Sequence, residues 1–171
     1  MSMHTRYYLD IFENAAGCLD KKLLAKKQVE VATGTYMNSV FLKLYKKAWT
    51  NNIPDALNSP SRIFFSVWVT DKEIKEEKLL YNIHALKLRH LKGYTIESRK
   101  FAADFRARFK NIEHCWPNVS IQFGPLTLMQ GWVEAATANL QDEILDLSAR
   151  FLTMDNMVDG LLAGYRRSDS R

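Results

Sequence analysis

The stretch "RIFFSVWVT", residues 62–70, is apolar on both faces and decides the expected fold class. Side chains alternate between the two faces of a β-strand. One face then carries four apolar side chains, those of Ile63, Phe65, Val67 and Val69. Phe64 and Trp68 fall on the opposite face, so we expect that face to be covered too, by helices that precede the strand in the chain.

The residues that follow alternate between strand and helix patterns. A charged connection at 71–78 leads into a second strand at 79–89, "LLYNIHALKLR". A helix then begins at Thr95 or Ser98 and runs to about Asn111, with an inward stripe of Phe101, Phe105 and Phe109. Residues 116–135 predict two strands around a Phe-Gly-Pro turn. Two helices complete the chain, at 138–152 and 154–165.

The residues before the strand at 62–70 are expected to be mainly helical. A helix at 6–16 has one apolar face. Residues 20–31 are ambiguous, because Asp20 could cap a short helix while "QVEVAT" could form a short strand. Residues 35–49 repeat apolar side chains at the helical period, and Lys43, Lys46 and Lys47 lie off that stripe. This pattern predicts a helix with Thr35 as its N-cap.

The expected fold is therefore α+β, in a single domain of residues 1–171. A helical N-terminal part, residues 1–58, precedes a part at 59–171 with the order β-β-α-β-β-α-α. Two β-β-α units in series predict a four-stranded antiparallel sheet with helices packed on it. The element order of residues 62–152 resembles that of the small double-wing bacterial proteins proposed to bind nucleic acid. The resemblance lies in element order alone and transfers no functional residue.

Length and composition are those of a globular domain. The chain has 171 residues, of which 47% are hydrophobic and 25% charged. No stretch approaches the roughly 20 apolar residues of a membrane helix, and the first residues lack a secretory apolar core. Cys18 and Cys115 are far apart, which predicts two reduced cysteines, at least one of them packed in the interior. We therefore expect a cytoplasmic protein without a membrane partner.

The positive charge of the chain is concentrated in one segment. The net charge is +5, and residues 89–110 hold seven Lys and Arg against Glu97 and Asp104. A local field of this kind attracts anionic partners. The leading hypothesis is a non-enzymatic module that binds nucleic acid or an acidic protein through Lys87, Arg89, Arg99, Arg106 and Lys110. Tyr81 and Tyr94 are the aromatic residues expected to stack on unpaired bases.

A pocket on the sheet is the alternative, which would make the protein a small-ligand binder or a small enzyme. Gly124 and Gly131 interrupt an otherwise apolar hairpin, and a glycine in a strand marks a bulge or a close approach by a ligand or backbone. The pocket would be lined by His84, Gln130, Trp132 and Glu134. A joint acid–base role would require His84 and Glu134 to lie within direct contact or one water of each other.

Metal, cofactor and catalytic motifs do not emerge from the sequence. On one strand, His84 and His90 would lie about 20 Å apart, too far to share a metal ion whose bonds to imidazole are about 2 Å long. The chain has no HExxH, no CxxC and no glycine-rich phosphate loop. We expect no metal and no cofactor, and the sequence assigns no catalytic residue. The N-terminal amphipathic helices could instead form a homo-oligomer interface, with Tyr7, Phe64 and Trp68 buried between chains.

Overall fold

The computed structural model describes residues 3–51 and 54–168. Five antiparallel strands form one sheet in chain order: β1 Val29–Tyr36, β2 Ser39–Lys46, β3 Arg62–Val69, β4 Lys78–Leu86 and β5 Thr127–Glu134. The α-helices are α1 Met3–Cys18, α2 Lys21–Lys27, α3 Asp71–Lys75, α4 Ser98–Phe109, α5 Leu140–Phe151 and α6 Asp155–Ala163. Strands and helices together give the α+β class and the antiparallel sheet that the sequence predicts.

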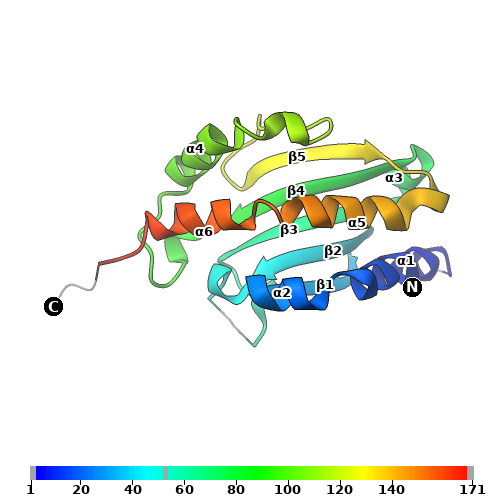
Figure 1. Cartoon of the computed structure of the whole chain (residues 1–171), viewed down its shortest axis with the longest axis horizontal. Coiled ribbons are helices and arrows are strands. Elements are labelled where there is room, and N and C mark those ends of the chain that lie inside the picture. Colours follow the sequence, from blue (N-terminus) through cyan, green and yellow to red (C-terminus); the bar gives the residue numbers. More distant parts are fainter. Residues whose placement is uncertain (1–2, 52–53, 169–171) are drawn as a thin grey trace.

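Helices cover one face of the sheet. In Figure 1, α5 and α6 follow each other lengthwise over the sheet, α1 and α2 lie over the β1–β2 side, and α4 lies beside β5. α1 packs on α5, β1 and β2, and its apolar side chains Tyr8, Phe12 and Ala15 join the core. This packing gives the apolar face of α1 a partner within the chain. The core continues under α5, where the rings of Phe65 and Phe151 stack with centroids 4.6 Å apart.

The helix expected at residues 35–49 is wrong, because this segment is half of a β-hairpin. Tyr36 pairs with Ser39 across a two-residue turn, in which Met37 has a φ of 51°. Val40, Leu42 and Leu44 face the core, with at most 5% of their surface exposed. Phe41 and Tyr45 on the other face supplied the extra apolar residues that imitate a helical period. Residues 1–58 are therefore not purely helical, and Thr35 lies in β1 instead of capping a helix.

The sheet has five strands where four were expected. From residue 62 onward the order is β3-α3-β4-α4-β5-α5-α6, so the β-β-α-β-β-α-α order is wrong. Residues 116–123 form an isolated bridge, Ser120 to Gln130, in place of the first strand of the expected hairpin. The difference removes the basis of the resemblance to double-wing proteins. The missing strand is replaced by β1 and β2 from the N-terminal part.

Other elements agree with the sequence. β3, β4, α4, α5 and α6 lie where the periodicity predicts them, and Phe101, Phe105 and Phe109 are fully buried. The two readings of residues 20–31 are both correct for part of the segment. Asp20 caps α2 by accepting hydrogen bonds from the backbone of Lys22 and Leu23, and β1 begins at Val29.

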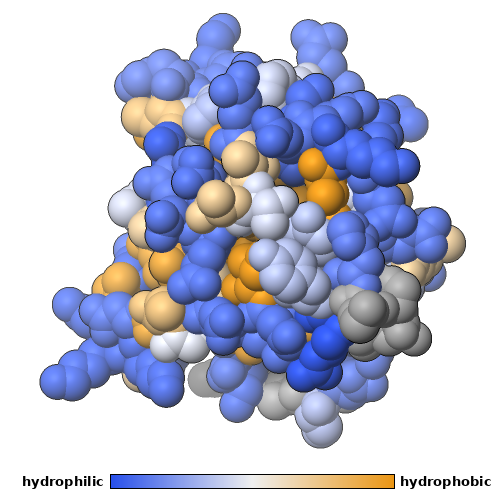
Figure 2. Space-filling view, turned by 90° about the vertical axis from the view of Figure 1, so that its right-hand side faces the viewer, coloured by the Kyte–Doolittle hydropathy of each residue, from blue (hydrophilic) through white to orange (hydrophobic). Residues whose placement is uncertain are grey.

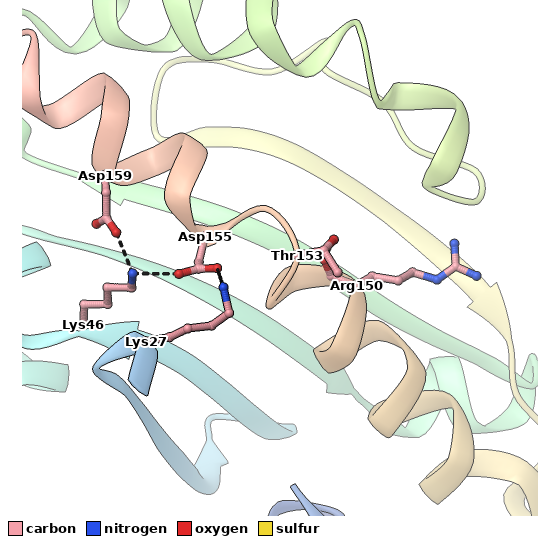
Figure 3. Close-up of polar contacts among 6 residues, drawn as sticks. All are labelled: Lys27, Lys46, Arg150, Thr153, Asp155 and Asp159. Carbon is pink, nitrogen blue, oxygen red and sulfur yellow. Dashed lines mark hydrogen bonds and ion pairs between the residues drawn. The ribbon is translucent and has the colours of Figure 1, made fainter. Parts of the chain in front are cut away.

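A partly buried cluster of four charged residues links α6 to the sheet and to α2 (Figure 3). The Lys46 amine on β2 lies between two carboxylates, 2.7 Å from Asp155 Oδ2 and 2.5 Å from Asp159 Oδ2. Lys27 at the end of α2 reaches the second oxygen of Asp155 at 3.0 Å. The indole of Trp49 donates to Asp159 Oδ1. Two cations and two anions balance in this cluster, so its charges are satisfied within the protein.

The end of the molecule at the right of Figure 1, where α1 begins and α3 lies, is mostly hydrophilic, with small hydrophobic areas between polar residues (Figure 2). Among the helices within residues 3–51 and 54–168, none has the length and apolar character needed to cross a membrane.

Candidate binding site on the open face of the sheet

The sheet face opposite the helices carries a cavity of about 690 Å³. Phe64 and Trp68 line it, so the expectation that N-terminal helices cover these two residues is wrong. The rest of the lining comes from the β1–β2 hairpin, from β3 and β4, and from residues 55–58 of the connection between β2 and β3. Its side chains from the strands include Phe41, Lys43, Arg62, Phe64, Ser66, Trp68, Asn82, His84 and Leu86.

Three basic side chains surround the ring of Phe64. The Lys43 amine lies 4.5 Å from the ring centroid, the Arg62 guanidinium carbon 5.3 Å, and the His84 ring centroid 5.4 Å. The strand register explains the grouping, because Phe64 pairs with His84, and Lys43 with Ser66 of the same β3 face. The Lys43 amine also lies 4.3 Å from the centroid of Phe41, so it is held between two aromatic faces.

Burial lowers the pKa of each of these three groups. Desolvation, followed by the nearby charge of Arg62, lowers the pKa of Lys43 to about 8. Desolvation also lowers the pKa of His84, and the charges of Lys43 and Arg62 act in the same direction, against a hydrogen bond to the Leu126 carbonyl. The pKa of Arg62 is lowered by desolvation as well. Burial is the largest cause of each shift, and it outweighs the interactions that favour the charged forms.

Polar atoms in the lining lack hydrogen-bond partners within the described residues. Arg62 Nη1 donates to the Ser59 carbonyl at 2.7 Å, but the buried Arg62 Nε has no acceptor. Asn82 is 2% exposed, and its Oδ1 is also without a partner. Leaving a buried polar group unpaired costs about 1–3 kcal/mol, so such atoms call for a specific explanation. One carboxylate, Asp55, lines the same cavity, where its Oδ1 accepts from Asn58 Nδ2 at 2.9 Å.

The four residues of the predicted pocket do not form one site. His84 lines the cavity, and Gln130 Oε1 lies 3.5 Å from Asn82 Nδ2 on the neighbouring strand. Trp132 pairs with Leu80, and the Lys78 amine lies 4.6 Å from the centroid of its ring. Trp132 does not line the cavity. Glu134 pairs with Lys78 at the start of β4. Lys78 and His84 are six residues apart on this strand, so their backbones are separated by about 20 Å. A joint acid–base role of His84 and Glu134 is therefore excluded.

The packing of Tyr81 against β5 explains why residue 131 is a glycine. A Cβ at this position would lie 2.3 Å from the Tyr81 hydroxyl. That hydroxyl donates to the Pro117 carbonyl at 2.7 Å, and Tyr81 is fully buried on the helix side of the sheet. The close approach suggested by the glycine is thus that of a tyrosine side chain, and Tyr81 cannot stack on a base.

Three of the five predicted basic contact residues come together. Lys87, Arg89 and Arg99 line a second cavity of about 560 Å³, together with Glu97 and residues 125–126. Arg106 instead donates to the carbonyls of Phe123, Gly124, Thr127 and Leu128. It anchors the segment before β5 and is not free to contact a partner. Lys110 is exposed at the C-cap of α4, about 16 Å along the helix from Arg99.

Lys87 and Arg89 do not leave a strand together as expected. β4 ends at Leu86, Lys87 has a φ of 47°, and Leu88–His90 form a 3₁₀ turn. Tyr94 is half-buried and forms a backbone bridge with Arg166. Arg89 Nε donates to the ring of His90, which is exposed.

The two cysteines are exposed, and the described residues form no metal-binding group. Cys18 and Cys115 are both free and exposed, so the expectation of an interior cysteine is wrong. Within the described part of the chain, no group of three or more His, Cys, Asp or Glu residues is arranged to hold a metal ion.

Three residues that line the cavity, Lys43, Arg62 and Asn82, are not among the predicted site residues. The helix expected at residues 35–49 would place Lys43 on its polar side. The alternation in "VFLKLYK", residues 40–46, is the signal that could have found it. On a strand, Lys43 joins Phe41 on the face opposite Leu42 and Leu44.

Comparisons with protein-family models, with curated proteins and with solved structures found no match to the chain.

Proposed function

We propose that the protein binds a small anionic ligand, with an aromatic or other planar apolar part, in the cavity on the open face of the sheet. The observation that carries the proposal is the group of Lys43, Arg62 and His84 around Phe64. Within the described residues, neither Lys43 nor Arg62 forms an ion pair. A ligand anion would supply the negative charge that these side chains lack.

The shape and lining of the cavity support a small molecule. A volume of about 690 Å³ falls within the roughly 300–1,000 Å³ of small-molecule sites. Phe41, Phe64 and Trp68 provide apolar and aromatic surface, while Lys43, Arg62 and Asn82 add polar side chains to the lining. A few polar groups in an apolar lining fix the orientation of a ligand.

The test is calorimetric titration with 2-naphthoate and with its neutral counterpart, 2-naphthamide. We expect the carboxylate to bind at least about tenfold more tightly, since a hydrogen bond to a charged group contributes about 1.5–3 kcal/mol. Lys43→Met and Arg62→Gln should each weaken naphthoate binding about tenfold. Lys47→Met is the matched control, because Lys47 is 61% exposed and outside the cavity. Equal binding of the two compounds, or no binding by either, would refute the proposal.

A second candidate is the binding of nucleic acid or an acidic protein, which the convergence of Lys87, Arg89 and Arg99 on one groove favours. Fluorescence anisotropy with single- and double-stranded DNA and RNA, across a salt series, tests it. Cations on phosphates should give binding that weakens steeply with salt. Arg99→Ala should reduce that slope, whereas no binding at low salt removes nucleic acid from consideration.

Cytoplasmic location and homo-oligomerisation stay predictions. Of the three aromatic residues expected at an interface between chains, Tyr7 is the one on the N-terminal helices. Its side chain is exposed. Sedimentation at several concentrations would decide the oligomeric state.

A further inference from the structure

The Lys43 amine borders the open-face cavity without a carboxylate partner among the described residues. It lies 4.3 and 4.5 Å from the ring centroids of Phe41 and Phe64, and no carboxylate within the described residues lies within 4 Å of it. The two rings attract a cation, but the Arg62 guanidinium contacts the same Phe64 ring and opposes a second positive charge beside it. Burial of the amine opposes its charged form as well. The amine borders the cavity, so a bound molecule can reach it.

These surroundings favour the reactive, uncharged form of the amine. With a pKa near 8, about a quarter of Lys43 is neutral at pH 7.5, against about 0.1% of a lysine at 10.5. Desolvation in an apolar site next to another cation is one of the ways by which proteins activate a lysine as a nucleophile. Lys46, three residues further along β2, has the opposite environment and is held in its charged form by two aspartates.

The neighbouring Arg62 defines what kind of molecule would bring a reactive carbon to Lys43. Its guanidinium shares the Phe64 ring with the Lys43 amine, and among the described residues it donates one hydrogen bond, to the Ser59 carbonyl. The remaining donors of an arginine suit a carboxylate or a phosphate. A ligand whose anionic group is held by Arg62 would present its other end along Phe64 to Lys43.

We propose that Lys43 forms a reversible imine with the carbonyl carbon of an anionic aldehyde or ketone bound in the open-face cavity. This inference rests on the proposed function, since the same cavity binds the anionic group. The neutral nitrogen attacks the carbonyl carbon, and the carbonyl oxygen takes up a proton to give a carbinolamine. Loss of water then forms the C=N bond. One amine and one carbonyl compound give one imine and one water, with no oxidant or reductant.

The test uses pyridoxal 5′-phosphate, a planar aldehyde with a phosphate, as a probe at pH 7.5. Sodium borohydride reduces any imine to a stable secondary amine, and peptide mass spectrometry locates the label. We expect Lys43 to be labelled at least tenfold faster than exposed lysines such as Lys47. Lys43→Arg should remove this fast labelling and leave that of Lys47 unchanged. Even labelling of all lysines, or no label on Lys43, would overturn the inference without requiring any variant to fold.

Pyridoxine 5′-phosphate, in which an alcohol replaces the aldehyde, separates this inference from the proposed function. It should bind in calorimetry and slow the labelling of Lys43 at least fivefold, with no effect on Lys47. Binding of the alcohol without trapping of the aldehyde would leave the proposed function standing and refute the imine. Fast labelling of Lys43 without protection by the alcohol would show a reactive amine and refute the anion site. Absence of both binding and labelling would refute both.

Discussion

Lys43 and Lys46 lie three residues apart on β2, and the two faces of the sheet give their amines opposite properties. Lys46 points to the helix side, where burial opposes its charge but the hydrogen bonds and charges of Asp155 and Asp159 outweigh burial and raise its pKa. Lys43 points to the open side, where burial and Arg62 lower its pKa to about 8. The difference arises from the partners that other elements supply, because the two lysines share a strand and a residue type.

Lys46 is paired with carboxylates inside the protein, whereas Lys43 borders a cavity and forms no ion pair with the described residues. Around Lys46, every member of the cluster has a partner: Lys27, Asp155, Asp159 and Trp49. Around Lys43, the neighbours are aromatic rings and other basic groups. A buried ion pair is costly to break because the remaining charge stays in a poorly solvated place. An uncompensated cation at a cavity is instead the place where an anion gains most.

The largest expected effect is that of Lys46→Met on stability. The substitution leaves the fully buried Asp155 with Lys27 alone, and Asp159 loses its lysine. Because Asp155 keeps Lys27 and Asp159 is partly exposed, we expect a loss of about 3 kcal/mol in the free energy of unfolding, the lower end of the range for a broken buried pair, measured by urea denaturation. The adjacent, exposed Lys47→Met should cost less than about 1 kcal/mol. Similar losses for the two variants would mean that the Lys46 cluster is not the tie between α6 and the sheet.

Gly131→Ala should have an intermediate effect and tests how tightly the helix-covered side is packed. The new Cβ would lie 2.3 Å from the Tyr81 hydroxyl, so the ring or β5 must shift. Overpacking of this kind costs about 1–3 kcal/mol. Gly124→Ala is the control, because a Cβ there meets nothing within 4 Å. A stability loss under about 0.5 kcal/mol for Gly131→Ala would show that this side can adapt more than dense packing allows.

The third expected effect is a pH dependence carried by Lys43. Between about pH 8 and its ordinary pKa of 10.5, Lys43 binds more protons in the unfolded chain than in the native protein. The free energy of unfolding of the wild type should therefore rise with pH in this window, relative to Lys43→Met, which lacks the group. Urea denaturation of both proteins at pH 7.5 and pH 10 measures the difference. A constant difference would indicate that Lys43 titrates as an ordinary solvated lysine.

Sequence patterns predicted the elements whose period is unambiguous. Phe101, Phe105 and Phe109 fit a helix and no strand, and "RIFFSVWVT" fits a strand. Residues 35–49 fit both periods, because Phe41 and Tyr45 add apolar residues on the open face of β2. Pairing of β2 with β1 and β3 decides between them, and such pairing is invisible in the local pattern.

The candidate site was predicted only in part for the same reason. His84 was singled out from its own strand, and it does line the cavity. Glu134 was paired with it on sequence alone, and the register of β4 and β5 separates them by six residues. Arg106 was counted as a free cation, although its carbonyl partners lie 17 to 22 residues further along the chain.

The sequence by itself determined the α+β class, the two-faced strand at β3 and the concentration of positive charge in the middle of the chain. These properties depend on residue type and on local spacing, which the chain carries in any conformation. Only the tertiary structure decided which lysine is paired and which is not. The partners of Lys46 come from α6, more than a hundred residues away, and Lys43 meets Phe64 and Arg62 only through the register of β2 and β3. The sequence determines which residues are charged, whereas the surroundings of each charge depend on elements that folding brings together.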